Sequence, residues 1–193
     1  MLSYKESLKI LKETKALVDG HFILSSGLHS PQYVQCAQLL SYPHEAKNLC
    51  ESLAKKIENE FKNFDLILSP AMGGIIIGYE IGRLLKKKTI FAERVNGNFE
   101  LRRSFNINKN ERVLIVEDVI TTGKSSEECN KLVKSYSADV VGYGCIIDRS
   151  KNHSILKNKI VSQISLDIPT YQEDKIPNDL NKIQAVKPGS RNI

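Results

Sequence analysis

Residues Val113–Ser125 read VLIVEDVITTGKS, and this stretch decides the fold. Four consecutive aliphatic residues without polar alternation are typical of a strand that is buried on both faces of a parallel sheet. Two adjacent acids follow the strand, Glu117 and Asp118, and a turn rich in hydroxyl groups then leads into a helical pattern. Ligands of open parallel sheets bind beyond the carboxyl ends of the strands, so we expect the functional site at this turn.

The segments around this stretch alternate between short apolar runs and helical patterns. We expect strands at 65–69, 89–92, 113–116, 138–147 and 160–168. We expect helices at 3–18, from Pro43 to about 61, at 74–86 and at 125–136. Residues 21–37 read as strand and turn, and 93–110 as an irregular segment or a hairpin. This order predicts an α/β fold with a mostly parallel central sheet that is flanked by helices.

The chain offers no linker, internal repeat or low-complexity tract that would divide it, so we expect one domain over residues 1–193. Gly78 and Gly82 lie one helical turn apart, which indicates close packing of their helix on the sheet. The last stretch, 171–193, is polar and contains Pro177 and Pro188. We expect it to be a tail laid over the surface.

Composition excludes several classes of protein. The 193 residues are 41% hydrophobic and 26% charged, as in ordinary globular proteins. The longest apolar stretches fall far short of the roughly 20 residues that cross a bilayer, and the charged N-terminus is unlike a signal peptide. Four cysteines lack CxxC or zinc-ligand spacing, so we expect buried free thiols and a cytoplasmic location. Trp is absent and aromatics are only 7%, which disfavours a base-stacking platform for nucleic acid.

The turn after the acidic pair has the parts of an anion-binding loop: Thr121, Thr122, Gly123, Lys124 and Ser125. Free backbone N–H groups at a helix N-terminus, hydroxyl groups and a glycine that permits close approach all favour a phosphate. Carboxylates beside a phosphate repel it unless they contact something else, such as sugar hydroxyls or a cation. The combination therefore indicates a phosphorylated sugar as the ligand.

Two other interpretations of this turn are weaker. A P-loop, GxxxxGK[ST], would end at Gly123-Lys124-Ser125, but its first glycine would fall at position 118, which is Asp118. The polar residues could also only cap the strand and the helix. One cap needs one side chain, whereas this segment supplies five polar loop residues and two carboxylates.

The stretch resembles the phosphoribosyl-pyrophosphate signature of the type I phosphoribosyltransferases. Further stretches resemble the orotate phosphoribosyltransferase family within that group, in order and at the expected spacing along nearly the whole chain. They are GHFILSSGLHSPQYVQCA (20–37), SPAMGGIIIGYEIGRLL (69–85), FAERVNGNFELRRSF (91–105), the pair Asp148-Arg149, and KPGSR (187–191). The resemblance implies a hood formed by about residues 1–40 with the C-terminal segment, over a core at about 43–170.

The resemblance also implies roles for individual residues. Glu117 and Asp118 would contact the ribose hydroxyls, and the loop Val119, Ile120, Thr121, Thr122, Gly123, Lys124 and Ser125 would bind the 5′-phosphate. Thr121 and Arg149 would contact orotate, where a planar guanidinium suits a planar anion. From position alone, a surface Arg149 paired with Asp148 is equally compatible. Ser26 and Gly27 would belong to the hood that closes over the pyrimidine.

Pyrophosphate would be received by two further segments. Met72 and Gly73 would belong to the pyrophosphate loop, and Arg94, Arg102 and Arg103 to a mobile catalytic loop that reaches the neighbouring subunit's site. Better-known members of the family carry a lysine where Ser25 stands, a Tyr-Lys pair at Met72-Gly73, and a loop rich in lysine and histidine. Their lysines cannot be carried over, and we expect arginines to replace them.

The implied activity is the transfer of ribose 5-phosphate from phosphoribosyl pyrophosphate to orotate in pyrimidine biosynthesis. Mg²⁺ would be the cofactor, bound mainly through the substrate, with Glu117 and Asp118 reaching it through water. A homodimer is implied, with no nucleic-acid or membrane partner. Two alternatives stay open: a phosphoribosyltransferase for another base, and a regulator that senses phosphoribosyl pyrophosphate and binds nucleic acid.

The charge distribution fits a phosphate-rich substrate. The net charge is +6, and the stretch from Arg83 to Arg112 holds this whole surplus, with nine basic and three acidic residues. The rest of the chain is therefore balanced. This basic stretch includes the segment that resembles the mobile loop.

Overall fold

The computed structural model describes residues 1–150 and 154–188. Its strands are β1 (Leu17–Ile23), β2 (His29–Val34), β3 (Leu66–Pro70), β4 (Lys88–Val95), β5 (Asn98–Leu101), β6 (Arg112–Ile120), β7 (Asp139–Asp148) and β8 (Ile160–Ser165). Its helices are α1 (Tyr4–Glu13), α2 (Cys36–Leu40), α3 (Pro43–Glu60), α4 (Gly73–Leu85), α5 (Lys124–Ser135), the 3₁₀ turn η1 (Glu173–Lys175) and α6 (Asn178–Asn181). Among these described segments, no helix is long and apolar enough to cross a membrane.

The central sheet has six strands in the order β5-β4-β3-β6-β7-β8. All neighbouring pairs are parallel except β4 and β5, which form an antiparallel hairpin through Arg94↔Phe99. The predicted mostly parallel α/β fold is confirmed, and within 93–110 the hairpin interpretation is the correct one. The order brings the ends of β3, β6 and β7 together at one edge of the sheet.

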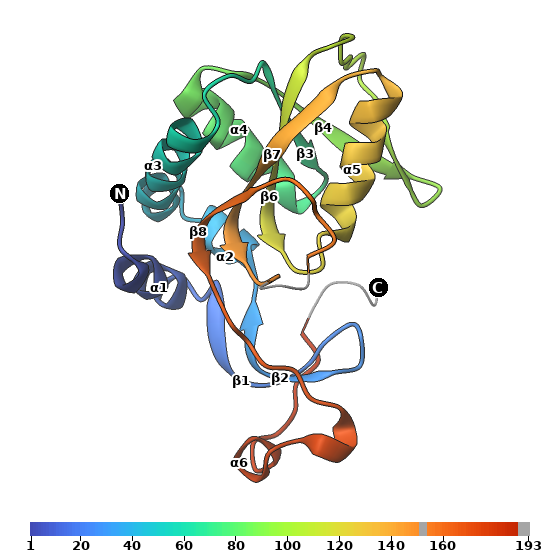
Figure 1. The fold of residues 1–193 in the computed structure, drawn as a ribbon. Helices are drawn as coiled ribbons and strands as arrows, with labels where there is room; N and C mark the ends of the chain where they lie inside the picture. The colour runs from blue at the N-terminus through green and yellow to red at the C-terminus, as the bar shows by residue number, and fades with distance from the viewer. Residues whose placement is uncertain (151–153, 189–193) are drawn as a thin grey trace.

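Helices cover both faces of this sheet (Figure 1). On one face α3 and α4 bury Ile57 and Ile81 against sheet residues such as Leu114, and on the other α5 buries Val133. The helix α4 packs closely on the central sheet, as its glycine pair predicted. A Cβ on Gly78 would lie 2.0 Å from Ser69 Oγ, so no larger residue fits there.

A second, two-stranded sheet lies beyond the carboxyl edge of the central sheet (Figure 1). It is the antiparallel hairpin β1–β2, and the C-terminal segment joins it through the bridges Phe22↔Val186 and His29↔Tyr171. The expectation of a tail laid over the surface is therefore wrong for the described part of 171–193. This segment pairs through its backbone with the hairpin, which a polar sequence does not reveal.

Several boundaries differ from the expected ones. The first helix ends at Glu13 rather than at residue 18, because Lys15 has a left-handed backbone (φ 56°) and strand β1 begins at Leu17. The short helix α2 was not predicted, and β6 continues to Ile120, so that both acids lie inside the strand. The four cysteines are buried free thiols, as expected.

Candidate active site

The end of β6 carries the acidic pair, and the neighbouring end of β7 carries Arg149. The two strands stay paired to Ile120↔Asp148, and the Arg149 N–H donates to the Ile120 carbonyl oxygen at 2.8 Å. Arg149 therefore leaves the sheet directly beside the point where the chain turns into Thr121. Arg149 and Thr121, the two residues expected to contact orotate, are therefore neighbours at this edge of the sheet.

Burial sets the electrostatics of the acidic pair. Burial is the largest effect on the pKa of Glu117, which is raised to about 7. The hydrogen bond from Ser126 lowers this pKa, and the neighbouring charge of Asp118 raises it. The Ser126 hydroxyl donates to Glu117 Oε2 at 2.5 Å. Burial also raises the pKa of Asp118, against a lowering hydrogen bond from the Val119 N–H to Oδ1 at 2.9 Å. A ligand that donates hydrogen bonds to these carboxylates would favour their ionised forms.

The turn between β3 and α4 meets Asp118. A Cβ on Gly73 would lie 2.8 Å from Asp118 Oδ1, so the carboxylate fills the space of the missing side chain. The preceding residue, Met72, is 82% exposed and follows a cis peptide bond from Ala71. The residues expected to receive pyrophosphate therefore lie against one of the residues expected to hold the ribose.

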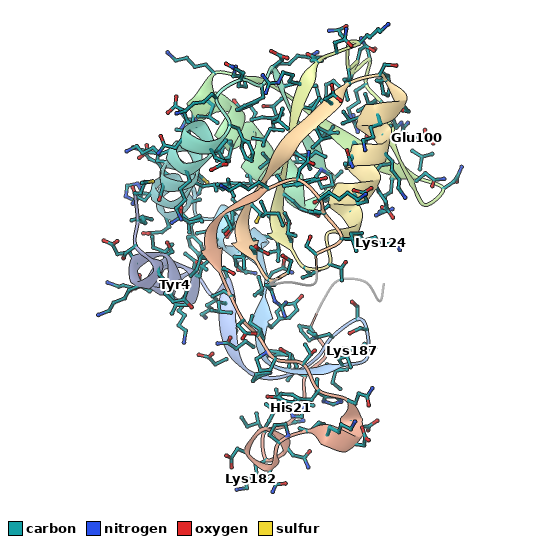
Figure 2. All side chains as sticks on the ribbon, viewed as in Figure 1. Tyr4, His21, Glu100, Lys124, Lys182 and Lys187 are labelled. Carbon is teal, nitrogen blue, oxygen red and sulfur yellow. The ribbon has the colours of Figure 1, made fainter. Side chains whose placement is uncertain are left out.

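The turn after β6 presents its polar groups to solvent. Thr121, Thr122 and Lys124 are exposed, and Figure 2 shows Lys124 at the end of α5 nearest the β1–β2 hairpin. Gly123 is the N-cap residue and has a left-handed backbone (φ 80°), so among the described residues no side chain caps α5 from this position. The Lys124 N–H donates to Thr122 Oγ1 at 3.4 Å, and the N–H groups of Ser125 and Ser126 lie in the same first turn, where an anion can bind.

A later segment supports this turn from behind. The Ile155 N–H donates to the Thr122 carbonyl oxygen at 3.2 Å, and a Cβ on Gly123 would lie 2.7 Å from Leu156 Cγ. Glycine is therefore required at position 123 both by the backbone angle and by the close approach of Leu156. The segment that follows β7 supports the loop that follows β6.

Arg149 is half-buried, and its Nε atom has no hydrogen-bond partner among the described residues. Burial lowers the pKa of its guanidinium group. Asp148 Oδ1 instead accepts from the backbone N–H and the hydroxyl of Ser150, at 2.8 and 2.6 Å. A buried donor without a partner is costly, so this geometry favours a ligand-binding arginine over a surface arginine paired with Asp148.

The hairpin arginines are held by carboxylates. Arg94 donates to Glu128 on α5 and to the Gly97 carbonyl oxygen, and its guanidinium lies 4.1 Å from the centre of the Phe99 ring. Arg103 makes two hydrogen bonds to Glu93, at 3.1 and 3.0 Å. Arg102 is exposed.

Ser26 and Gly27 lie at the exposed tip of the β1–β2 hairpin. Gly27 has a φ of 82°, and its N–H donates to the Leu24 carbonyl oxygen at 2.9 Å. Within the described ranges no hydrogen bond joins this tip to Thr121 or Arg149. In the KPGSR stretch, residues 189–191 lie outside the described part of the chain.

Comparison with known proteins now adds to this geometry. The family model "Phosphoribosyl transferase domain" matches residues 37–172. An orotate phosphoribosyltransferase of Parvibaculum lavamentivorans is 47% identical over 189 residues, which are 96% of this chain and 97% of that protein. The chain belongs to the orotate phosphoribosyltransferase family. The family resemblance of the sequence is thereby confirmed.

Solved structures share the fold of this orotate phosphoribosyltransferase family member. An orotate phosphoribosyltransferase of Aeropyrum pernix superposes with a TM-score of 0.72 at 22% identity, covering 82% of this chain and 92% of that one. An adenine phosphoribosyltransferase of Thermoanaerobacter pseudethanolicus reaches 0.61 at 20% identity, covering 70% and 88%. Likeness at this level shows the fold alone, and proteins named for two different bases share it.

Sequence reasoning missed three residues that organise the site of this family member: Ser126, Glu128 and Leu156. Ser126 follows the signature directly, but no spacing rule pairs a first-turn serine with an acid nine positions earlier. The contacts of Glu128 and Leu156 join segments that are far apart in the sequence. Only the folded chain brings them together.

Proposed function

We propose that this chain catalyses the transfer of ribose 5-phosphate from phosphoribosyl pyrophosphate to orotate, which gives orotidine 5′-monophosphate and pyrophosphate. The observation that carries the choice of base is the buried Nε of Arg149, which has no hydrogen-bond partner among the described residues and lies beside the loop after β6. An anionic, planar base would supply an acceptor for this Nε–H group. The relative from Parvibaculum lavamentivorans, which bears the name of this activity, supports the proposal over almost its whole length.

The sugar phosphate would lie along the end of β6. Glu117 and Asp118 would accept hydrogen bonds from the ribose hydroxyls, and the loop from Val119 to Ser125 would donate its N–H and hydroxyl groups to the 5′-phosphate. Met72 and Gly73 would border the pyrophosphate, and Thr121 with Arg149 the orotate ring. The β1–β2 hairpin with Ser26 and Gly27, joined by the C-terminal segment, would form the hood over the base.

Catalysis would come from positioning and charge neutralisation. The bond from the anomeric carbon to pyrophosphate breaks ahead of bond formation to the orotate nitrogen, which leaves positive charge on the ribose ring. The hairpin arginines Arg94, Arg102 and Arg103 would neutralise the leaving pyrophosphate. Orotate gives up its ring proton readily, so the chain need not supply a strong base.

Mg²⁺ is the proposed cofactor, and it would help neutralise the pyrophosphate. Glu117 and Asp118 are the carboxylates near the end of β6, where the sugar phosphate would lie. Their partial burial suits contact with Mg²⁺ through water rather than direct coordination by several carboxylates. Among residues 1–150 and 154–188 no group of three His, Cys, Asp or Glu side chains gathers to hold a metal. Mg²⁺ keeps water and substrate oxygens as ligands, so the substrate would provide most of its coordination.

A homodimer is also proposed, with α4 as its contact surface. Met72, Ile76 and Tyr79 form an apolar stripe at helical spacing and are 82%, 56% and 67% exposed. Large apolar side chains grouped in this way mark an interaction surface. A second copy bound at this surface would lie next to Met72 and hence next to the pyrophosphate loop. The β4–β5 hairpin of one copy could then reach the active site of the other. We propose a cytoplasmic location for this enzyme.

A panel of bases tests the choice of substrate. The purified protein is incubated with phosphoribosyl pyrophosphate, Mg²⁺ and either orotate, adenine or hypoxanthine, and the nucleotide product is separated by chromatography. We expect product with orotate alone. Product with a purine instead would establish the alternative of another base, and salt-sensitive nucleic-acid binding without any product would establish a regulator.

A further inference from the structure

Ser126 is a fully buried hydroxyl in the first turn of α5. It donates to Glu117 Oε2 at 2.5 Å, across nine residues of sequence. A hydrogen bond from a neutral hydroxyl to a carboxylate is among the stronger kinds in proteins. This contact joins the helix that begins at the phosphate loop to the carboxylate at the end of β6.

The contact restricts the hydrogen bonds that the Glu117 carboxylate can accept. One lone pair of Oε2 is occupied by Ser126, while the rest of the carboxylate can still accept hydrogen bonds. Because Ser126 is only three residues beyond Gly123, any shift of the loop on phosphate binding would also move the donor that holds Glu117. The phosphate end and the ribose end of the substrate would then be coupled through one side chain.

The charges around Glu117 come from few groups. Asp118 lies next to it on β6, and Arg94 from β4 acts on it electrostatically. Two thiols also interact with it, Cys129 of α5 and Cys145 of β7, and burial raises the pKa of each, so both stay neutral near pH 7. Arg94 is itself paired with Glu128. Ser126 is therefore the one direct hydrogen-bond donor to Glu117 among the described side chains.

We infer that Ser126 is a positioning residue for the ribose: its hydroxyl holds the Glu117 carboxylate in the orientation that accepts the sugar hydroxyls. The inference rests on the proposed function, because it assigns Glu117 to the ribose. Ser126 itself would touch no substrate. Its effect would therefore reach substrate binding only through Glu117.

The test measures affinity for phosphoribosyl pyrophosphate with Mg²⁺ by calorimetry at one fixed pH. The variants are Ser126→Ala, Glu117→Gln and the double variant. Loss of the donor lets the Glu117 side chain leave this orientation, so Ser126→Ala should weaken binding about tenfold, the effect of losing one hydrogen bond to a charged group. In the Glu117→Gln background, Ser126→Ala should cause no further loss of affinity. Ser135→Ala, an exposed serine on the same helix, serves as the matched control and should behave as wild type.

Two results would overturn the inference. One is unchanged affinity in Ser126→Ala, and the other is a loss of the same size in the Glu117→Gln background. Turnover of orotate by the wild type is measured in parallel. Intact binding of phosphoribosyl pyrophosphate without orotate turnover would contradict the proposed function and leave the role of Ser126 to be decided by the binding data.

Discussion

The carboxylate of Asp118 occupies the space that a side chain at position 73 would need. A Cβ on Gly73 would lie 2.8 Å from Oδ1 and 2.9 Å from both Cγ and Oδ2. A side chain at position 73 would therefore displace this carboxylate from its place at the end of β6. Two loops that we assign to different parts of one substrate share this contact.

Gly73→Ala should raise KM for phosphoribosyl pyrophosphate, because the new methyl group displaces Asp118. Misplacement of a positioned group by about 1 Å can cost about 100-fold, and we expect a loss of about 10- to 100-fold in kcat/KM. Steady-state kinetics measures it. Ser135→Ala, at an exposed serine near the end of α5, is the control and should leave the kinetics unchanged. Equal kinetics for Gly73→Ala and wild type would show that Asp118 need not stay where it is.

Glu117→Gln should stabilise the empty protein at high pH while it abolishes activity. Burial raises the pKa of Glu117 from 4.5 to about 7, so the folded state favours the protonated carboxyl. The stability that Glu117 contributes is fully present below pH 4.5 and is lost as pH rises through about 7. Glutamine escapes this loss, so the variant should gain on the order of 2 kcal/mol over wild type by pH 8.

Denaturant unfolding at pH 4 and pH 8 measures that gain. The exposed Glu100→Gln is the control and should show the same difference from wild type at both values of pH. A Glu117→Gln variant that is no more stable than wild type at pH 8 would contradict the assigned burial of this charge.

Arg149→Ala and Arg149→Lys should both raise KM for orotate and leave KM for phosphoribosyl pyrophosphate little changed. A lysine keeps the charge but loses the planar pair of donors. We expect losses of about 10- to 100-fold in kcat/KM for orotate, the range of a charged hydrogen bond. A lysine variant with wild-type affinity for orotate would show that only charge is recognised.

Arg103→Ala should lower kcat by about 100-fold, as expected for a group that stabilises developing charge. KM for orotate should change little. Arg83→Ala is a matched control, because Arg83 forms a similar exposed pair with Glu80, at 2.7 Å, on α4. Equal effects of the two substitutions would assign the loss to general changes in surface charge.

Tyr79→Asp should convert the proposed dimer to a monomer, because it places a charge within the apolar stripe of Met72, Ile76 and Tyr79. Light scattering with size-exclusion chromatography measures the mass. Tyr4→Asp is the control, since Tyr4 is also a largely exposed helical tyrosine, at 58%, on α1. A wild type that is monomeric at high concentration would rule out the dimer itself.

Much of the fold follows from local patterns in the sequence. The aliphatic run at 113–116 and the glycine pair on α4 predict a buried parallel strand and a closely packed helix, and both are present. The path of the C-terminal segment does not follow, because Val186 pairs with Phe22 through the backbone, across more than 160 residues. Such pairing leaves no periodic signal in a polar stretch.

The candidate site divides in the same way. The signature identifies the acids and the loop from Thr121 to Ser125, because they are contiguous. The fit of Gly73 to Asp118 and the hydrogen bond from Ser126 to Glu117 depend on how strands and helices pack. A motif names the residues that meet a ligand, whereas the contacts that hold those residues come from the tertiary structure.

The most direct test of the central claim is the consumption of orotate. The loss of orotate absorbance is followed after phosphoribosyl pyrophosphate and Mg²⁺ are added to the purified protein, and released pyrophosphate is measured in the same samples. We predict that absorbance falls and that one pyrophosphate appears for each orotate consumed. Unchanged absorbance at every Mg²⁺ concentration would contradict the account.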